Sequence, residues 1–562
     1  MRILRCGHAP VTWSRAGVIL LAYLLGAPAH ADTVGYVLTP MLDAGRLRVE
    51  LTWDTQGRTQ SALTASAQWG TVADVPALIR DLRFTGVAQV KPNKTRWLLE
   101  HTRGATLTCR YEVDPGRRDL TWEAMHYPIA NRSFFHGIGN TFLLIPQAGG
   151  GLPEEYDITL RWQLPEGWTA VCSWGPGPHV GARLAPLDLR HSVYLAGKLV
   201  THTQQSDGHS ITVAMLDRFG FDAQEFARLA GTIVAHECRF MEEKDFPPFV
   251  VTAVPVGEPV KTGDTRVAGM GLHHSFALFA APKSTLTDAF ENLFAHELFH
   301  YWNGGVLRAQ QPLKLVYWFV EGLTDYYAWR ILYEAGYWQP TEYAKWINRQ
   351  LREYARNPAA HARNDEIDAR FYQERDTIGA VAYQRGLLLA LRWHRLARDR
   401  GVSDGIDKLF KTLVQRGRRP GFELSNEGIR RAGLELLGDW FGSEFDKYVM
   451  QAETVEVPTN ALAPGLVGRL TPTYDYELGF DKDKSLRELR VRGLVSGSEA
   501  AKAALREADE LVGWKIRGEA DEKVELQVLR GGKTRTIRYY PRGQRRDVLQ
   551  FEPAEPARRK DP

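Results

Sequence analysis

Apolar and polar residues alternate along the first third of the chain, from about residue 32 to residue 218. The period of two is clearest from Leu47 to Trp53 and from Ile158 to Trp162. Glycine and proline clusters such as Gly149–Gly151 interrupt it. Period two broken by turn-forming residues is typical of sheets with one buried face. The pattern predicts an N-terminal antiparallel β domain over residues 32–220.

The spacing of apolar residues changes to a helical period further along. A short mixed stretch comes first, with a helix near Phe226 and a buried strand at Phe249–Val256. From Ser284 to about Met450, helical segments dominate, including WFVEGLTDYYAWRIL and GLLLALRWHRLA. These patterns predict a mostly α-helical domain over residues 221–455.

A third region, residues 465–543, contains strand-like segments around a short helix. The strands are expected at LRELRVRGL, KVELQVLR and KTRTIRYYP, and the helix at SEAAKAALREADEL. Residues 544–562 are charged and contain proline, so they are expected to form a flexible tail. The chain as a whole is predicted to be a multidomain α+β protein.

The first 31 residues have the features of an export signal. Arg2, Arg5 and Arg15 form a basic segment, and the apolar run GVILLAYLLG follows. Small residues at Ala29 and Ala31 suit cleavage before Asp32. The run is too short to cross about 30 Å of hydrocarbon comfortably. No later segment is apolar enough to do so, and we expect a periplasmic protein without stable membrane insertion.

Charge and cysteine content narrow the possible partners. The 562 residues carry a formal net charge of +4, which falls to about +1 when the three arginines of the signal are removed. This argues against a nucleic-acid partner held by phosphate attraction. Cys109, Cys172 and Cys238 would remain, and an oxidising compartment would permit one disulfide, whose pairing the sequence leaves open.

Residues 296–300 read His-Glu-Leu-Phe-His. Residues four apart share one face of a helix, so His296 and His300 can bind a single ion. Glu297 can then face a metal-bound water as general base. Thr285 and Asp288 suit a capping box at the start of this helix. His236-Glu237 lacks a second histidine at ligand spacing and is not assigned to the site.

A second predicted helix, WFVEGLTDYY, supplies the missing ligand. Catalytic zinc takes three protein ligands and keeps one position open. Glu321 is the third ligand, and Asp325, one turn later, can accept the spare N–H of a ligand histidine. Two imidazoles and a carboxylate suit one Zn²⁺ per chain, although other divalent ions stay open. An oxyanion donor is also required, and Tyr383 is one candidate among 21 tyrosines.

These motifs together resemble the gluzincin peptidases, and in particular the M61 glycyl aminopeptidase family, which is related to M1 aminopeptidases. His300-Tyr301-Trp302-Asn303 resembles the extension of the family's zinc helix, and Arg132 to Gly137 a motif of its N-terminal β domain. The resemblance implies a thermolysin-like catalytic domain that acts on peptide substrates. It also implies that Tyr383, in Tyr-Gln-Arg-Gly, is the tyrosine that stabilises the transition state.

The region from residue 465 to 543 resembles a PDZ domain, which the family often carries. Leu478, Gly479 and Phe480 stand where the carboxylate-binding loop would be. The resemblance implies binding of a peptide C-terminus or a protein partner by strand addition to a sheet edge. The alternative is a packing module without a ligand.

One segment departs from the pattern of the resembled aminopeptidases. They hold the substrate's free amine with a glutamate in a Gly-x-x-Glu-type segment. Here Gly271 and Leu272 can still align an extended peptide, but His273 stands where glutamate is expected. Three hypotheses therefore stay open: an aminopeptidase, an endopeptidase or peptidase of altered specificity, and a PDZ-based peptide-binding protein with a vestigial peptidase fold.

Overall fold

A computed structural model of the chain describes residues 32–55, 57–148, 155–261 and 263–554. The chain forms two compact units, residues 1–305 (unit 1) and 306–562 (unit 2). The predicted export signal, residues 1–31, lies outside the described residues. Among the described residues, no helix combines the length and apolar character needed to cross a bilayer.

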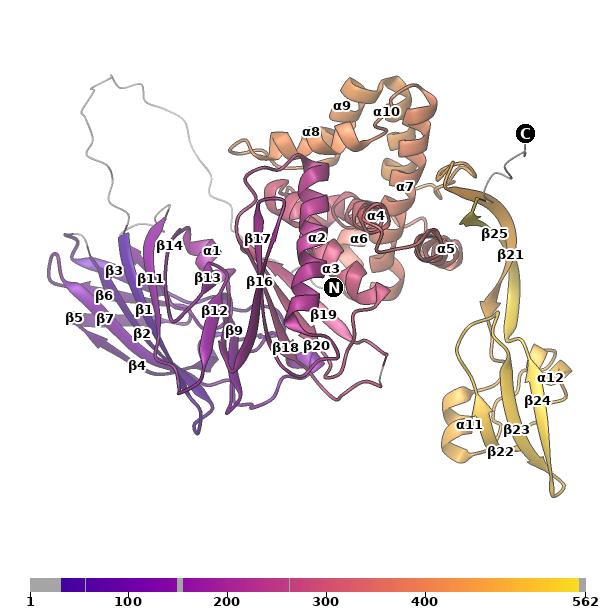
Figure 1. Cartoon of the computed structure of the whole chain (residues 1–562), viewed down its shortest axis with the longest axis horizontal. Coiled ribbons are helices and arrows are strands. Elements are labelled where there is room, and N and C mark those ends of the chain that lie inside the picture. Colours follow the sequence, from indigo (N-terminus) through magenta and orange to yellow (C-terminus); the bar gives the residue numbers. More distant parts are fainter. Residues whose placement is uncertain (1–31, 56, 149–154, 262, 555–562) are drawn as a thin grey trace. The chain divides into compact units, whose positions relative to one another are not determined.

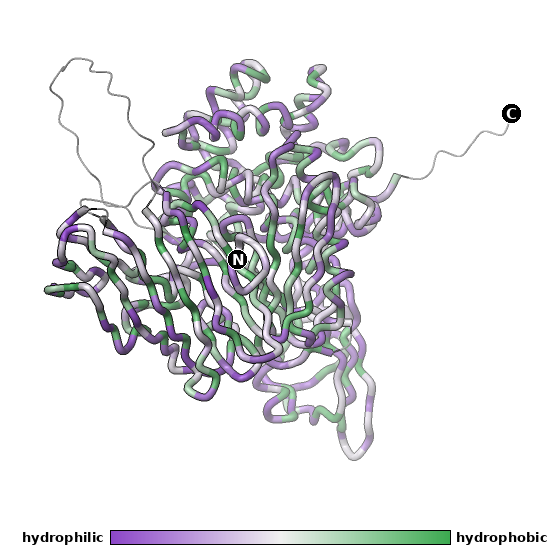
Figure 2. Tube along the Cα trace, turned by 60° about the vertical axis from the view of Figure 1, so that its left-hand side comes forward, coloured by the Kyte–Doolittle hydropathy of each residue, from purple (hydrophilic) through white to green (hydrophobic). Residues whose placement is uncertain are grey.

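Unit 1 begins with a six-stranded sheet in the order β14-β11-β1-β2-β7-β4 (Figure 1). Its strands are β1 (Asp32–Met41), β2 (Arg46–Asp54), β4 (Ile79–Thr85), β7 (Thr106–Val113), β11 (Tyr156–Trp162) and β14 (His179–Leu184). Alternate residues of β2 are buried, from Leu47 to Trp53, as the sequence predicts. The same alternation is visible as changing colour along the strands in Figure 2.

One strand pair departs from the antiparallel prediction. β1 runs parallel to β11, from the Asp32–Tyr156 pair to the Leu38–Trp162 pair. Period two specifies which side chains share a face and is the same for both strand directions. The alternation therefore predicted the buried face of β1 but carried no information on the direction of its neighbour.

Two further sheets complete the β-rich part of unit 1, in the orders β10-β3-β6-β5 and β13-β12-β15-β9-β8. The first contains β3 (Gln60–Thr64), β5 (Val87–Asn93), β6 (Arg96–His101) and β10 (Ile145–Ala148). The second contains β8 (Ile129–Ala130), β9 (Phe134–Ile138), β12 (Thr169–Cys172), β13 (Gly175–Pro176) and β15 (Val193–Gly197). The short helix α1 (Pro186–Arg190) precedes β15.

The three cysteines of the described residues are buried free thiols, so none of them forms the disulfide that an oxidising compartment would permit. Burial raises the pKa of the Cys172 thiol to about 12. It also raises the pKa of Cys109 and of Cys238 above the ordinary range. These groups behave as small apolar core residues.

A mixed sheet in the order β16-β17-β18-β20-β19 leads to the candidate site. It contains β16 (Leu199–Ser206), β17 (His209–Leu216), β18 (Phe249–Pro255), β19 (Val267–Leu272) and β20 (Ser275–Ala280). Strands β17, β18 and β20 are parallel, and β19 is an antiparallel edge strand. Helix α2 (Ala223–Met241) covers β16 and β17 (Figure 1), and α3 (Asp288–Phe299) lies against β19. The predicted domain boundary at residue 220 thus falls inside one continuous sheet.

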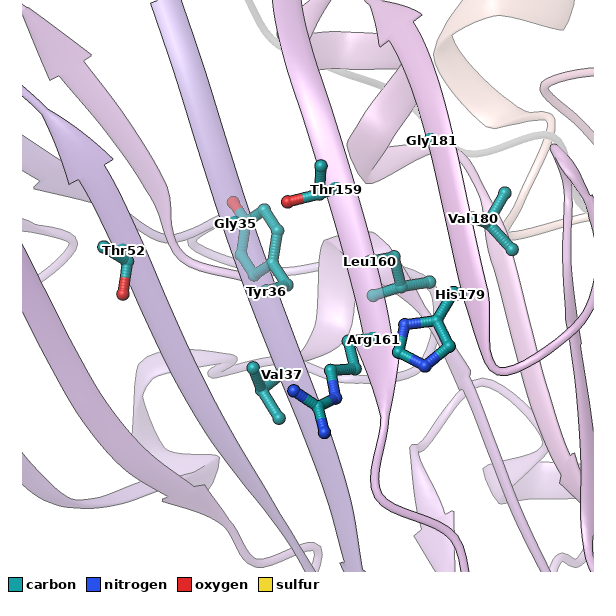
Figure 3. A pocket seen from close by; sticks show the side chains of 10 residues that line it. All are labelled: Gly35, Tyr36, Val37, Thr52, Thr159, Leu160, Arg161, His179, Val180 and Gly181. Atoms are coloured by element: carbon teal, nitrogen blue, oxygen red, sulfur yellow. The ribbon is translucent and has the colours of Figure 1, made fainter.

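A hollow of about 500 Å³ lies on the outer face of the six-stranded sheet (Figure 3). Its floor is a row of small residues brought side by side by strand register, namely Gly181, Thr159, Gly35 and Thr52. Two glycines in this row leave the sheet surface without side chains to fill it. The hollow contains none of the residues to which the sequence analysis assigned chemistry.

Unit 2 is helical up to residue 450. Its helices are α4 (Tyr317–Glu334), α5 (Pro340–Arg356), α6 (Asn364–Arg370), α7 (Ala380–Asp399), α8 (Asp407–Gly417), α9 (Asn426–Leu437) and α10 (Asp439–Phe445). Every residue of α4 from Tyr317 to Trp329 is buried. Such a helix is stable only when other elements surround it.

Helices α4 and α7 approach each other closely at two glycines. A Cβ atom placed on Gly386 would lie 1.7 Å from the backbone oxygen of Trp318 and 2.8 Å from Cα of Gly322. The two backbones can touch only because both positions lack side chains. Arg385, fully buried beside this contact, donates to the carbonyl groups of Ala360 (3.0 Å) and Ala362 (2.6 Å).

The C-terminal part of unit 2 differs from the predicted PDZ-like arrangement. It contains β21 (Leu466–Tyr476), α11 (Lys482–Glu488), α12 (Glu499–Lys502), β22 (Glu510–Lys515), β23 (Val524–Arg530), β24 (Lys533–Tyr539) and β25 (Arg542–Pro553). The first three residues of the strand predicted at LRELRVRGL belong instead to α11, which ends where Leu489 adopts a left-handed conformation (φ 52°). The predicted helix is confined to α12. Leu478 and Phe480 are buried in the core of this region.

The tail predicted from residue 544 onward contains an ordered strand. β25 pairs with β21 from Leu466–Pro553 to Tyr476–Arg542. It is attached to α5 by Asn348, which donates to the carbonyl of Phe551 (2.8 Å) and accepts from its N–H (2.6 Å). The charged composition of this segment reflects its exposed face, while Val548, Leu549 and Phe551 are buried.

Replacing Gly386 by alanine should destabilise unit 2 by about 1–3 kcal/mol or more, because the new methyl group meets backbone rather than a mobile side chain. Gly428→Ala is the matched control. The nearest atom to its Cβ is Oγ of Ser425, at 3.4 Å, and alanine is the better helix former. Urea denaturation of both variants measures the difference, and equal midpoints would contradict the proposed contact.

Candidate metal centre

The HELFH segment lies on helix α3, whose N-terminus is capped by a threonine. Thr287 is its N-cap, with Oγ1 accepting the N–H of Phe290 at 3.4 Å. The start predicted at Thr285 is thus displaced by two residues. His296 and Glu297 lie in the last turn of α3, and His300 is the C-cap residue.

The two histidines face one point with their Nε2 atoms. These atoms are 3.0 Å apart, close to the separation of about 3.3 Å that two nitrogens bound to one tetrahedral zinc would have. Nδ1 of His300 lies 2.9 Å from the backbone oxygen of Asn303. Because a carbonyl oxygen only accepts, Nδ1 must carry the proton, and Nε2 of His300 keeps the lone pair that a metal requires.

The bend that follows His300 makes this hydrogen bond possible. Asn303 (φ −93°, ψ 78°) and Gly304 (φ 133°) are non-helical and end the helix sharply. The carbonyl of Asn303 can therefore turn back toward the imidazole. Gly304 is the residue type that allows the second of these conformations at little cost.

The third predicted donor comes from α4. Glu321 is 1% exposed, and one of its carboxylate oxygens lies within 4.8 Å of an imidazole nitrogen of His296 and of His300. These three residues are the group of potential metal donors found among the described residues. Two imidazoles and a buried carboxylate form a donor set that suits Zn²⁺.

Glu297 is held against the edge strand β19. Its Oε2 atom accepts the N–H of Gly271 at 3.3 Å, and only 4% of its surface is exposed. A Cβ at position 271 would lie 3.6 Å from the carbonyl oxygen of Glu297 and 3.8 Å from its Oε2 atom, so the strand and the glutamate are in van der Waals contact. The predicted base and the predicted substrate-aligning strand are therefore neighbours.

His273, which stands in the place of the expected glutamate, lies in the turn between β19 and β20. Its Nδ1 atom is 3.3 Å from Oδ1 of Asp188, and its N–H donates to the carbonyl of His191 at 2.8 Å. The ring stacks on His274 with centroids 3.9 Å apart. Burial, together with the neighbouring His273, lowers the pKa of His274 to about 4.

The remaining predicted residues belong to unit 2. Tyr383 lies in the first turn of α7 and is partly buried against an apolar cluster around Tyr317. The α4–α7 glycine contact lies three residues after Tyr383 and one residue after Glu321, and it fixes their two helices together. Asp325, on α4, remains a prediction for His296, because the spare N–H of His300 goes to Asn303.

Glu237, which was not part of the predicted site, lies close to it in the structure. Glu237, on α2, is 0% exposed, and neither carboxyl oxygen has a hydrogen-bond partner among the described residues. Burial raises its pKa well above the ordinary value, and the only opposing influence comes from His296. A glutamate on the apolar face of α2 was the available signal, but its proximity to His296 depends on tertiary packing.

Comparison with known proteins supports the M61 resemblance over part of the chain. Residues 289–369 match the family described as M61 glycyl aminopeptidase. The matched segment holds the HELFH motif and Glu321. No curated protein sequence matches the chain.

Solved structures share the fold. An aminopeptidase N family protein from Idiomarina loihiensis is 17% identical, with 93% of this chain and 98% of that chain covered and a TM-score of 0.67. An M1 zinc metallopeptidase from Deinococcus radiodurans, bound to a Tyr-Ser-Ala substrate, is 14% identical, with 76% and 96% covered and a TM-score of 0.48. The first likeness confirms the predicted β-rich region followed by a helical domain.

Replacing Glu237 by methionine should stabilise the metal-free protein by about 1–3 kcal/mol, since an apolar side chain of similar volume removes an unsatisfied buried polar group. Urea denaturation with excess chelator measures this. Glu225→Gln, on an exposed position of α2, controls for charge and should change little. Destabilisation by Glu237→Met would show that the carboxyl has a partner, such as a buried water.

Proposed function

We propose that this protein is an exported zinc-dependent metallopeptidase that acts as an aminopeptidase of the M61 type. The observation that carries the proposal is the buried cluster of His296, His300 and Glu321, whose donor atoms lie within 4.8 Å of one another. The M61 match over residues 289–369 supports it. Export and a periplasmic location rest on the signal-like residues 1–31 alone.

One zinc ion held by the two histidines and Glu321 would polarise the scissile carbonyl and lower the pKa of a bound water. Glu297 takes the proton from the attacking water and delivers it to the leaving amine. The peptide lies along the edge strand at Gly271 and Leu272, which brings its scissile bond to Glu297. Tyr383 donates a hydrogen bond from its phenolic O–H to the developing oxyanion.

Endopeptidase activity is the second candidate. It is favoured by His273, because an imidazole alone binds an ammonium group far less well than a carboxylate does. An edge strand such as β19 can also align a peptide that extends in both directions.

The PDZ-based hypothesis has no observation of its own in its favour. Strand addition needs an exposed sheet edge next to the carboxylate-binding loop. The segment after Phe480 is the helix α11 and not a strand that could offer such an edge. Peptide binding at this region is therefore not part of the proposal.

Mass spectrometry of a peptide library, half with free and half with acetylated amino termini, tests the proposal. Zinc-loaded mature protein should remove single residues from free termini only. Glu297→Gln should retain one zinc per chain but lose about 10²- to 10⁴-fold in rate, because the base is lost and the ligands are kept.

The controls separate the candidates. His300→Ala should lose both zinc and activity. Internal cuts in both halves of the library would favour the endopeptidase. No cleavage beyond that of Glu297→Gln by a protein that carries zinc would reject the peptidase function.

A further inference from the structure

Position 273 lies at the end of the strand that runs past the catalytic base. The N–H groups of Gly271 and His273 both point away from β20, since one donates to Glu297 and the other to His191. Two residues of extended chain span about 7 Å. A peptide that runs antiparallel to β19 with its scissile bond at Glu297 carries its first α-amino group toward His273.

Asp188 supplies a carboxylate at this point. It lies on the short helix α1, which precedes β15, and its Oδ1 atom is 3.3 Å from Nδ1 of His273. The side chain of Asp188 is 39% exposed and that of His273 is 15% exposed. The pair is thus accessible from solvent at the turn of the β19–β20 hairpin.

We propose that Asp188 and His273 together form the site that recognises the free α-amino group of the substrate, in place of the single glutamate expected at position 273. This inference rests on the proposed peptidase function. It names the substrate class as peptides with an unblocked amino terminus.

The hydrogen-bonding chemistry of the pair fits an ammonium group. Nδ1 of His273 lies 3.3 Å from Oδ1 of Asp188, so the neutral tautomer with its proton on Nδ1 is the one that can donate to the carboxylate. Nε2 then has a lone pair and can accept an N–H of the substrate ammonium. The negative charge of Asp188 lies one imidazole away and offsets the positive charge of the bound amine.

Neighbouring contacts hold the imidazole in this orientation. The backbone of His273 is tied to His191, and its ring stacks on His274. His274 is neutral at neutral pH because burial lowers its pKa to about 4. The stacked ring therefore adds no positive charge that would repel the amine.

The alternative is that the pair has a purely structural role, as an ion pair that holds the β19–β20 hairpin against α1. Solvent-exposed ion pairs contribute little to folding stability, and the backbone bond to His191 already makes this connection. A purely structural ion pair would also give no selectivity for the substrate's amine. The two roles can therefore be separated by measuring selectivity.

The experiment compares a tripeptide that has a free amino terminus with its des-amino analogue, in which hydrogen replaces the α-amino group. In the zinc-loaded full-length mature protein, Asp188→Asn should lower kcat/KM for the free-amine peptide by about 10- to 100-fold, mainly through KM. Hydrolysis of the des-amino analogue should change less than about twofold. Asp188→Asn with His273→Glu should regain the selectivity, because a carboxylate then faces the amine directly.

Asp207→Asn is the matched control, since it removes another exposed ion pair of unit 1, the one with Arg239, and should leave the selectivity unchanged. Equal losses on both peptides, or unchanged selectivity in Asp188→Asn, would overturn the inference. Internal cleavage by the wild-type protein would overturn it while leaving the peptidase function intact.

A binding measurement distinguishes failure of the proposed peptidase function from failure of the inferred amine site. Zinc-loaded Glu297→Ala should bind the free-amine tripeptide more tightly than the des-amino analogue in calorimetry, and Asp188→Asn in that background should remove the difference. If the wild-type protein cleaves nothing, the proposed function fails, and this binding difference alone decides whether the amine site exists.

Discussion

The burial of several polar side chains at one point is the constraint on which the rest of the structure depends. His296, Glu297 and Glu321 are each at most 4% exposed, and the carboxyl of Glu237 is fully buried nearby. Removing such groups from water is costly unless each has a partner. A divalent cation could partner both imidazoles and Glu321 at once, which would offset the cost of burying them in the surrounding apolar core.

The surrounding elements are shaped by this requirement. α3 must end at His300 so that the chain can bend at Gly304 and return the carbonyl of Asn303 to the imidazole. β19 passes close enough to α3 for the N–H of Gly271 to donate to Glu297. The bend after His300 is a local irregularity that serves to orient a polar group rather than to fill the core.

The sequence predicted those parts of the molecule that depend on local periodicity and spacing. The strands up to residue 218, the HELFH helix and the helix of Glu321 follow from such patterns. Strand direction did not, because β1 would show the same alternation beside a parallel or an antiparallel neighbour. The strand predicted at LRELRVRGL overlaps the end of α11, because this sequence suits either state and tertiary packing decides between the two.

The candidate site shows the same limit. Spacing selected the three candidate ligands that the structure brings together, because both histidines lie on one helix and Glu321 follows closely in the chain. Glu237 lacked a recognisable spacing, since its partner belongs to another helix. Asp188 could not have been selected from sequence for the same reason, because it meets His273 only through the packing of α1 against the β19–β20 hairpin.

Because sequence spacing does not show contacts that arise from tertiary packing, a motif alone is an incomplete guide to specificity. The histidine at position 273 argues against amine recognition only if a subsite must be built from a single residue. The negative charge that binds an amine can be supplied by a carboxylate on any segment of the chain that reaches the subsite. Asp188, on α1, reaches the end of the edge strand, where it contacts His273. In the proposed site the carboxylate orients the imidazole so that Nε2 can accept an N–H of the amine. A substitution that looks like the loss of a function in the sequence can therefore be a redistribution of that function over two residues.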